Sequence, residues 1–193
     1  MTTSVSESLE DRRALVTGGT KGTGAVIARR LAHAGATVLV TARSRPHDVE
    51  EKTFIAADLS SAEGADHVVA EVGARMGGVD ILVNNLGGSE APAGGFAALS
   101  EDDWARELNT NLLAAVRLDR ALLPHMIALG KGAIVHVTSI QRRMPLWNGT
   151  LAYAAAPGPT GQSPTPWTPR RPTRRLRPRP PRRPSPVQAP SPR

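Results

Sequence analysis

Short apolar segments typical of buried strands alternate with longer segments typical of helices along most of the chain. Strands are expected at 13–16, 37–41, 53–57, 79–83 and 133–137. Helices are expected at 25–34, 61–76 and 100–129. Strands that alternate with helices of about ten residues or more predict an α/β fold, in which right-handed crossovers wind helices onto both faces of a parallel sheet. Pro124 is expected to kink the third helix or to mark its last turn.

The composition changes abruptly after Ala156, which divides the chain into a body at 1–156 and a tail at 157–193. The tail holds 13 of the 17 prolines and nine arginines, but no acidic residue. It has too little apolar surface to offset the entropy of folding, so it is predicted to be disordered or polyproline-like. The whole chain carries a net charge of +7, and subtracting the nine tail arginines leaves the body at −2. A nucleic-acid partner therefore needs to be considered for the tail alone.

The remaining composition excludes several kinds of site. The chain has no cysteine, so disulfides and thiolate metal sites are excluded. Its five histidines lack the paired spacing of metal ligands, and no metal site is predicted. The acidic N-terminus has no apolar signal segment, and no apolar run approaches the roughly 20 residues of a membrane span. We therefore expect a soluble cytoplasmic protein without membrane contact.

A glycine-rich loop runs from Thr17 to Gly24, between the first expected strand and the first expected helix. Gly18 would permit a tight turn, Gly22 a close approach of the backbone to a pyrophosphate, and Gly24 close packing of the helix on the strand. The helix N-terminus adds free N–H groups and the positive end of its dipole. The loop therefore predicts a dinucleotide site, although an ordinary glycine-rich turn would explain it equally well if it stood alone.

The end of the second expected strand indicates which nucleotide is bound. An acidic side chain at this point accepts a hydrogen bond from the ribose 2′-OH of NAD. This chain instead has Arg43 there, and no carboxylate before Asp48. The guanidinium of Arg43 can pair with a 2′-phosphate, and Lys21 in the glycine loop can add a second positive charge. These residues favour NADP(H) over NAD(H); two solvated surface cations are the alternative.

Further patterns accompany the loop. Residues 17–24 fit Thr-Gly-x-x-x-Gly-x-Gly, and Asn84-Asn85-Leu86-Gly87 is similar to Asn-Asn-Ala-Gly. Asn111 falls in the long helix, Ser139 ends the fifth strand, and Tyr153 follows 14 positions later. Together these patterns resemble the classical short-chain dehydrogenase/reductase family over about residues 10–156.

The resemblance implies a Rossmann-like fold and a cofactor site. The implied cofactor-binding residues are Thr17, Gly18, Lys21, Gly22, Gly24, Arg43, Asp58, Asn84, Asn85 and Gly87. In the family, Asp58 would contact the edge of the adenine ring, and Asn84 and Asn85 would hydrogen-bond backbone between strands. Gly87 would leave space beside the cofactor. Taken alone, Asp58 is explained equally well as a loop or helix-capping residue.

The resemblance also implies hydride transfer between NADP(H) and a small alcohol or carbonyl substrate. Tyr153 would exchange a proton with the substrate oxygen, and Ser139 would hydrogen-bond that oxygen and orient it. Asn111 would hold a water molecule in a proton relay, with Asn109 a weaker candidate for that role. Considered singly, Ser139 is better explained as a strand-end hydroxyl and Asn111 as a polar residue on a helix surface.

The family has a lysine four positions after its tyrosine, where this chain has Pro157. The lysine favours ionisation of the tyrosine and binds the nicotinamide ribose. Proline supplies neither charge nor donor and helps to end the helix, so catalysis is expected to be impaired. The family continues with this helix and two more strands, none of which is recognisable here, and the fifth strand is expected to be an exposed edge.

The switch at codon 156 suggests a reading-frame change in a GC-rich gene. The coding DNA tests this hypothesis, which fails if neither other frame restores a lysine and an apolar helix.

The favoured interpretation is a truncated NADP(H)-dependent oxidoreductase, and the alternatives are a non-catalytic nucleotide-binding remnant or a polyanion-binding protein acting through its tail. The family suggests a homo-oligomer, but the segment of its usual interface is missing.

Overall fold

The computed structural model describes residues 8–156. Five strands form one parallel sheet in the order β3-β2-β1-β4-β5. The strands are β1 (Arg13–Thr17), β2 (Thr37–Ala42), β3 (Phe54–Ala56), β4 (Ile81–Asn84) and β5 (Ala133–His136). The predicted doubly wound, Rossmann-like α/β fold is confirmed. The strand order reverses between β1 and β4, and the carboxyl ends of these two strands are where such sheets bind ligands.

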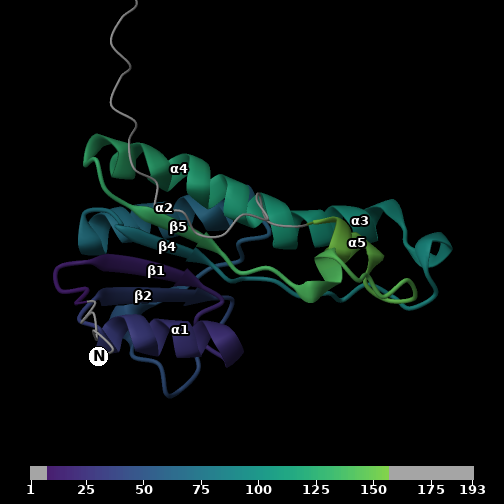
Figure 1. The fold of residues 1–193 in the computed structure, drawn as a ribbon, viewed down its shortest axis with the longest axis horizontal. Helices are drawn as coiled ribbons and strands as arrows, with labels where there is room; N and C mark the ends of the chain where they lie inside the picture. Colours follow the sequence, from purple (N-terminus) through teal and green to yellow (C-terminus); the bar gives the residue numbers. More distant parts are fainter. Residues whose placement is uncertain (1–7, 157–193) are drawn as a thin grey trace, which may run out of the picture.

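Helices cover both faces of the sheet, with α1 on one face and α2 and α4 on the other (Figure 1). The helices are α1 (Gly22–His33), α2 (Ala62–Met76), α3 (Glu101–Leu108), α4 (Ala114–Ala128) and α5 (Leu151–Ala155). Beyond the ends of the strands, α3 and α5 pack against each other (Figure 1). This pair extends the molecule on the side where the chain leaves β4 and β5.

The helix expected over 100–129 is present as α3 and α4, joined by a π-helical turn at Asn109–Leu113. The π-helical turn was not predicted, because no residue type specifies one. Pro124 lies inside α4, which continues for about one more turn to Ala128. The prediction that Pro124 marks the last turn is therefore confirmed.

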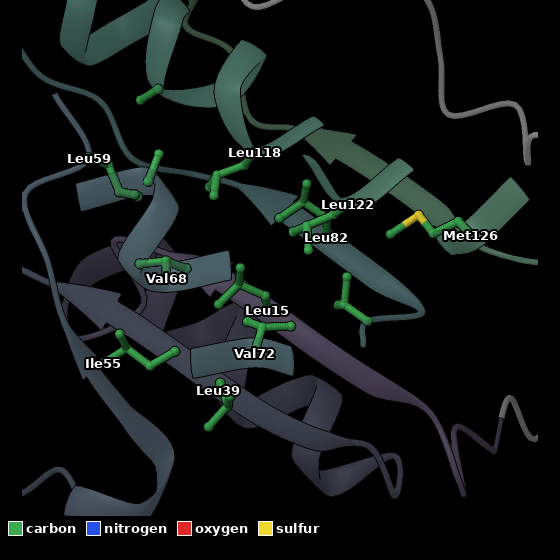
Figure 2. Packing of buried hydrophobic residues seen from close by; sticks show 13 residues of the cluster. Leu15, Leu39, Ile55, Leu59, Val68, Val72, Leu82, Leu118, Leu122 and Met126 are labelled. Carbon is green, nitrogen blue, oxygen red and sulfur yellow. The ribbon is translucent and has the colours of Figure 1, made fainter. Parts of the chain in front are cut away.

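The two faces of the sheet are built by alternate residues of each strand. Leu15, Leu39 and Leu82 are buried on the α2 and α4 face, in a cluster that includes Leu118 of α4 (Figure 2). Their neighbours Val16, Val40 and Val83 are buried on the opposite face, against Ala28 of α1. Because successive side chains of a strand point to opposite faces, a strand buried on both must be apolar throughout, which explains the continuous apolar runs in the sequence.

Two of the helices, α2 and α3, begin at serine caps. The Ser61 hydroxyl accepts a hydrogen bond from the Gly64 amide at 3.0 Å and begins α2. Ser100 and Asp103 form a complete capping box at the start of α3. These caps fix where the two helices begin, immediately after the loops that follow β3 and β4.

Within residues 8–156, β5 pairs with β4 on one side and with no strand on the other, as predicted for an exposed edge. The predicted disorder of the tail and the expected effect of Pro157 on its helix lie outside the described residues. Inside that range, no helix has the length and apolar character to cross a bilayer, and no three His, Asp or Glu side chains converge on a metal site.

Candidate nucleotide-binding and active site

The glycine loop lies where its sequence predicted, between the central strand β1 and the start of α1. Gly18 has φ of +61° and its amide donates to the carbonyl of Thr41 at 2.9 Å, which ties the turn to β2. Gly22 has φ of +53°, and a Cβ placed on it would have no neighbour within 4 Å. The backbone at Gly22 is therefore open to a ligand. No acidic residue occupies the first turn of α1, so the positive end of the helix dipole is uncompensated there.

Two glycines of the loop are required by close packing instead. A Cβ on Gly24 would lie 2.2 Å from the carbonyl oxygen of Gly18. A Cβ on Gly19 would lie 2.7 Å from a methyl carbon of Val40. The packing role of Gly24 matches the prediction, whereas that of Gly19 was missed. The distance from Gly19 to β2 depends on how β1 and β2 pair, and the sequence of the loop gives no information about that pairing.

A cavity of about 590 Å³ lies beside the glycine loop, over the ends of β2 and β3. Gly18, Lys21, Arg43 and Asp58 all contribute to its walls. The side chain of Arg43 is 75% exposed, and its Nη2 lies 3.9 Å from Oε1 of Glu90 across the cavity. Arg43 is therefore available to an anionic ligand on this side of the site.

Asp58 serves a local turn at the edge of the same cavity. Its Oδ1 accepts from the Ser60 hydroxyl at 2.7 Å and from the Ser60 amide at 3.0 Å. These bonds hold the pKa of Asp58 below its usual value, with a smaller contribution from the charge of Arg43. The loop interpretation of Asp58 is thus observed, and its side chain also lines the cavity in which the adenine ring was expected.

The asparagines after β4 differ in what they bind. Nδ2 of Asn85 donates to the carbonyls of Thr17 at 3.1 Å and Gly18 at 3.2 Å, so it fastens β4 to the glycine loop as expected. For Asn84 the expected backbone contact was wrong. Its buried amide donates to Oδ1 of Asp119 on α4 at 2.8 Å and lies 3.5 Å from Nδ1 of His136. The Asn84 side chain points instead toward α4 and β5, where Asp119 and His136 lie.

Thr17, the last residue of β1, connects β1 to the segment that follows β4. Its buried hydroxyl accepts from the amides of Asn85 at 3.0 Å and Leu86 at 2.9 Å, and lies 3.4 Å from the carbonyl of Val83. Thr17 therefore fixes the path of the chain past the site. Its side chain is committed to the protein backbone.

Ser139, Tyr153 and Asn111 line one cavity of about 120 Å³ beyond β4 and β5. Ser139 follows β5 and accepts from the amide of Gln141 at 3.2 Å, while Tyr153 lies on α5 and is half-buried. The structure thus brings together three residues that the sequence separates by up to 42 positions (153 minus 111). Asn109 does not line this cavity; its side chain bonds Arg117 at 2.7 Å.

Asn111 lies in the π-helical turn and is bonded to the loop after β4. Its Oδ1 accepts from the amide of Gly88, and its Nδ2 donates to the carbonyl of Gly88, both at 2.9 Å. The same Nδ2 lies 3.0 Å from Oε2 of Glu107, a carboxylate buried to 3% exposure. Glu107 was missed in the sequence, although its spacing of four from Asn111 places both side chains on one face of the helix.

The two cavities adjoin, since Leu59, Leu86, Gly87 and Thr110 line both. Gly87, predicted to leave space beside the cofactor, lies at this junction, and a Cβ on it would lie 3.2 Å from Oδ1 of Asn111. The structure therefore presents one long crevice. Its glycine loop and Arg43 lie toward one end, and Ser139 and Tyr153 toward the other.

Known proteins are similar to this chain in sequence and fold. A family model described as short chain dehydrogenase matches residues 12–158. Gluconate 5-dehydrogenase of Gluconobacter oxydans is 34% identical over 162 residues, and dehydrogenase/reductase SDR family member 4 of Bos taurus is 36% identical over 147 residues. The alignments cover 78% and 71% of this chain but only 62% and 52% of those proteins.

A crystal structure of L-sorbose reductase from Gluconobacter frateurii, complexed with NADPH and L-sorbose, superposes with a TM-score of 0.70 at 33% identity. The match covers 78% of this chain and 60% of that one. The chain therefore spans about half to three fifths of the length of the proteins it resembles.

Proposed function

Because this chain belongs to the short-chain dehydrogenase family of oxidoreductases, we propose that it binds NADP(H) in the crevice above β1 and β4 and that its hydride-transfer activity toward an alcohol or carbonyl substrate is impaired. The observation that carries the proposal is the open backbone at Gly22, the first residue of α1, where no side chain caps the helix. Backbone N–H groups at such a helix start bind linked phosphates.

Arg43 supports NADP(H) as the nucleotide. Its exposed guanidinium lines the larger cavity, close enough to Asp58 for its charge to lower that carboxyl's pKa. A 2′-phosphate placed there would gain a forked, charge-assisted pair, which NAD(H) does not offer. Lys21, which also lines this cavity, would add a second positive charge.

Ser139 and Tyr153 support a site of carbonyl or alcohol chemistry at the other end of the crevice. When bound, the nicotinamide ring supplies or accepts the hydride. Tyr153 would exchange the proton at its phenol oxygen, and Ser139 would hold the substrate oxygen through its hydroxyl. Asn111 would steady the wall beside them through Gly88, since its amide is bonded there on both sides.

Impairment follows from the residue four positions after Tyr153, which is Pro157. A positive charge near the phenol favours loss of its proton, and proline has neither a charge nor a donor to offer. The proposed state is therefore a nucleotide site that still forms beside a weakened reaction centre.

A thermal melt of the full chain with and without nucleotide tests the proposal. We expect NADPH to raise Tm, by more than NADH at equal concentration, because only the folded state binds it. We also expect no turnover of NADPH across a panel of aldehydes, ketones and sugars. An unchanged Tm with both nucleotides would refute the binding site, and rapid turnover would refute the impairment.

A further inference from the structure

The loop after β4 is fastened by a buried carboxylate that the proposed reaction does not use. Glu107 is 3% exposed, and no basic side chain pairs with it among the described residues. Its Oε1 accepts from the amide of Glu90 at 2.9 Å and from the hydroxyl of Ser89 at 3.2 Å. Its Oε2 accepts from Nδ2 of Asn111 at 3.0 Å. A buried charge kept by hydrogen bonds alone requires several donors, and Glu107 has three.

The side chains of Glu107 and Asn111 together hold three consecutive residues of the loop, Gly88 to Glu90; we call this set of contacts the bracket. Asn111 bonds the amide and the carbonyl of Gly88, and Glu107 bonds Ser89 and Glu90. Glu107 also bonds Asn111 itself, so the two side chains support each other on one helix face. Residues 88–90 have no regular secondary structure, so no ladder of backbone hydrogen bonds holds them in place.

The bracketed loop is a wall of the larger cavity. Gly88, Ser89 and Glu90 line it together with Lys21 and Arg43, and Glu107 lines it as well. We propose that Glu107 is a positioning residue, which holds this wall at the distance that a bound dinucleotide requires. The inference rests on the proposed nucleotide site and assigns Glu107 a role in its affinity.

If Glu107 affected the ligand only through its charge, its removal would have the opposite effect on affinity. A negative charge in the wall of a phosphate-binding crevice would repel the ligand if charge alone mattered. Removing that charge would then tighten binding. If Glu107 acts through the loop, removing its charge weakens binding, because a glutamine has one acceptor oxygen where the carboxylate has two.

The test compares Glu107→Gln with Glu101→Gln, an exposed carboxylate on the same helix that lines neither cavity. Kd for NADPH is measured by nucleotide fluorescence. For Glu107→Gln we expect Kd to rise about tenfold, the effect of one lost hydrogen bond to a charged group. Glu101→Gln should leave Kd unchanged. An unchanged or lower Kd for Glu107→Gln would overturn the proposal.

Hydrogen exchange of the Glu90 amide separates this proposal from that of the nucleotide site. In the nucleotide-free protein, Glu107→Gln should lower protection of that amide and Glu101→Gln should not. The parent chain could bind no NADPH while the Glu90 amide still follows this pattern. That result would support the contacts of Glu107 with the loop and refute a role for Glu107 in nucleotide binding. Equal protection in both variants would refute the bracket itself.

Should Glu107→Gln fail to fold, Ser89→Ala gives the same test in a milder form. It removes one donor and leaves the carboxylate intact. We expect a Kd about threefold higher, at an unchanged Tm without nucleotide, since Glu107 keeps its other two donors, the Glu90 amide and Nδ2 of Asn111. A Kd equal to that of the parent chain would contradict the proposal.

Discussion

Arg13 holds Asp80 in a forked ion pair, with Nε 2.9 Å from Oδ2 and Nη2 3.2 Å from Oδ1. The pair lies at the amino ends of β1 and β4, opposite the crevice, and Asp80 is 3% exposed. Arg13 lowers the pKa of Asp80 through its side-chain hydrogen bonds, against the opposing effect of burial, and Lys131 adds a weaker charge at 3.8 Å. This pair fastens the two central strands together.

The Asp80 pair predicts how stability depends on pH. Its folded-state pKa is lowered, so its stabilisation is complete above the unfolded value, about 4, and is lost as pH falls through the folded value. Asp80→Asn should cost about 2–4 kcal/mol at pH 7 and less at pH 3. Urea denaturation at the two pH values measures this. Asp102→Asn, at an exposed carboxyl, is the control, and an equal cost at both pH values would contradict the assignment.

Arg43 should decide which nucleotide binds. Arg43→Ala removes the charge that would face a 2′-phosphate, so Kd for NADPH should rise about tenfold or more, while Kd for NADH should change little. Fluorescence titration with both nucleotides gives the ratio. Arg45→Ala is the matched control, since Arg45 is exposed two positions away and does not line the crevice. An equal loss of affinity for both nucleotides would mean that Arg43 does not bind the 2′-phosphate.

Gly24 and Gly73 both lie within helices, but their surroundings predict opposite responses to alanine. A Cβ on Gly24 would meet the Gly18 carbonyl at 2.2 Å, so Gly24→Ala should push α1 from the loop, lower Tm by several degrees and weaken NADPH binding. A Cβ on Gly73 would meet nothing within 4 Å, so Gly73→Ala should stabilise the protein by about 0.5–1 kcal/mol. Thermal melts of both variants provide the comparison, and equal shifts would refute the packing argument.

The capping box at Ser100 should contribute about 1 kcal/mol to the free energy of unfolding. Ser100→Ala removes the hydroxyl that accepts from the amide of Asp103 at 3.2 Å. Urea denaturation of the variant should show that loss without a change in nucleotide affinity. A larger loss, or a change in Kd, would show that the start of α3 is coupled to the crevice.

The strands and the glycine loop could be predicted because they depend on local patterns. The apolar runs of β1, β2 and β4 follow from burial on both faces, and the loop requires glycine at Gly18 and Gly22 for backbone conformation. The patterns around Ser139 and Tyr153 predicted a shared site, and the two side chains do line one cavity.

The unpredicted parts of the site are those made by contacts distant in sequence. Asn84 was given a backbone role, but Asp119 and His136 lie next to it only after α4 and β5 have packed. Gly19 meets Val40 because β1 and β2 pair in a particular register. The partners of Glu107 come from a loop 17 and 18 positions earlier, which composition alone does not connect to it.

The unequal halves of the crevice have a consequence for fragments of the dinucleotide. The roomier half, about 590 Å³, is lined by Arg43 and the glycine loop, whereas the cavity lined by Ser139 and Tyr153 has only about 120 Å³. Recognition energy should then be concentrated on the adenosine portion. An adenosine 2′,5′-bisphosphate would compete with NADPH almost as well as the intact dinucleotide, while nicotinamide mononucleotide would scarcely displace it.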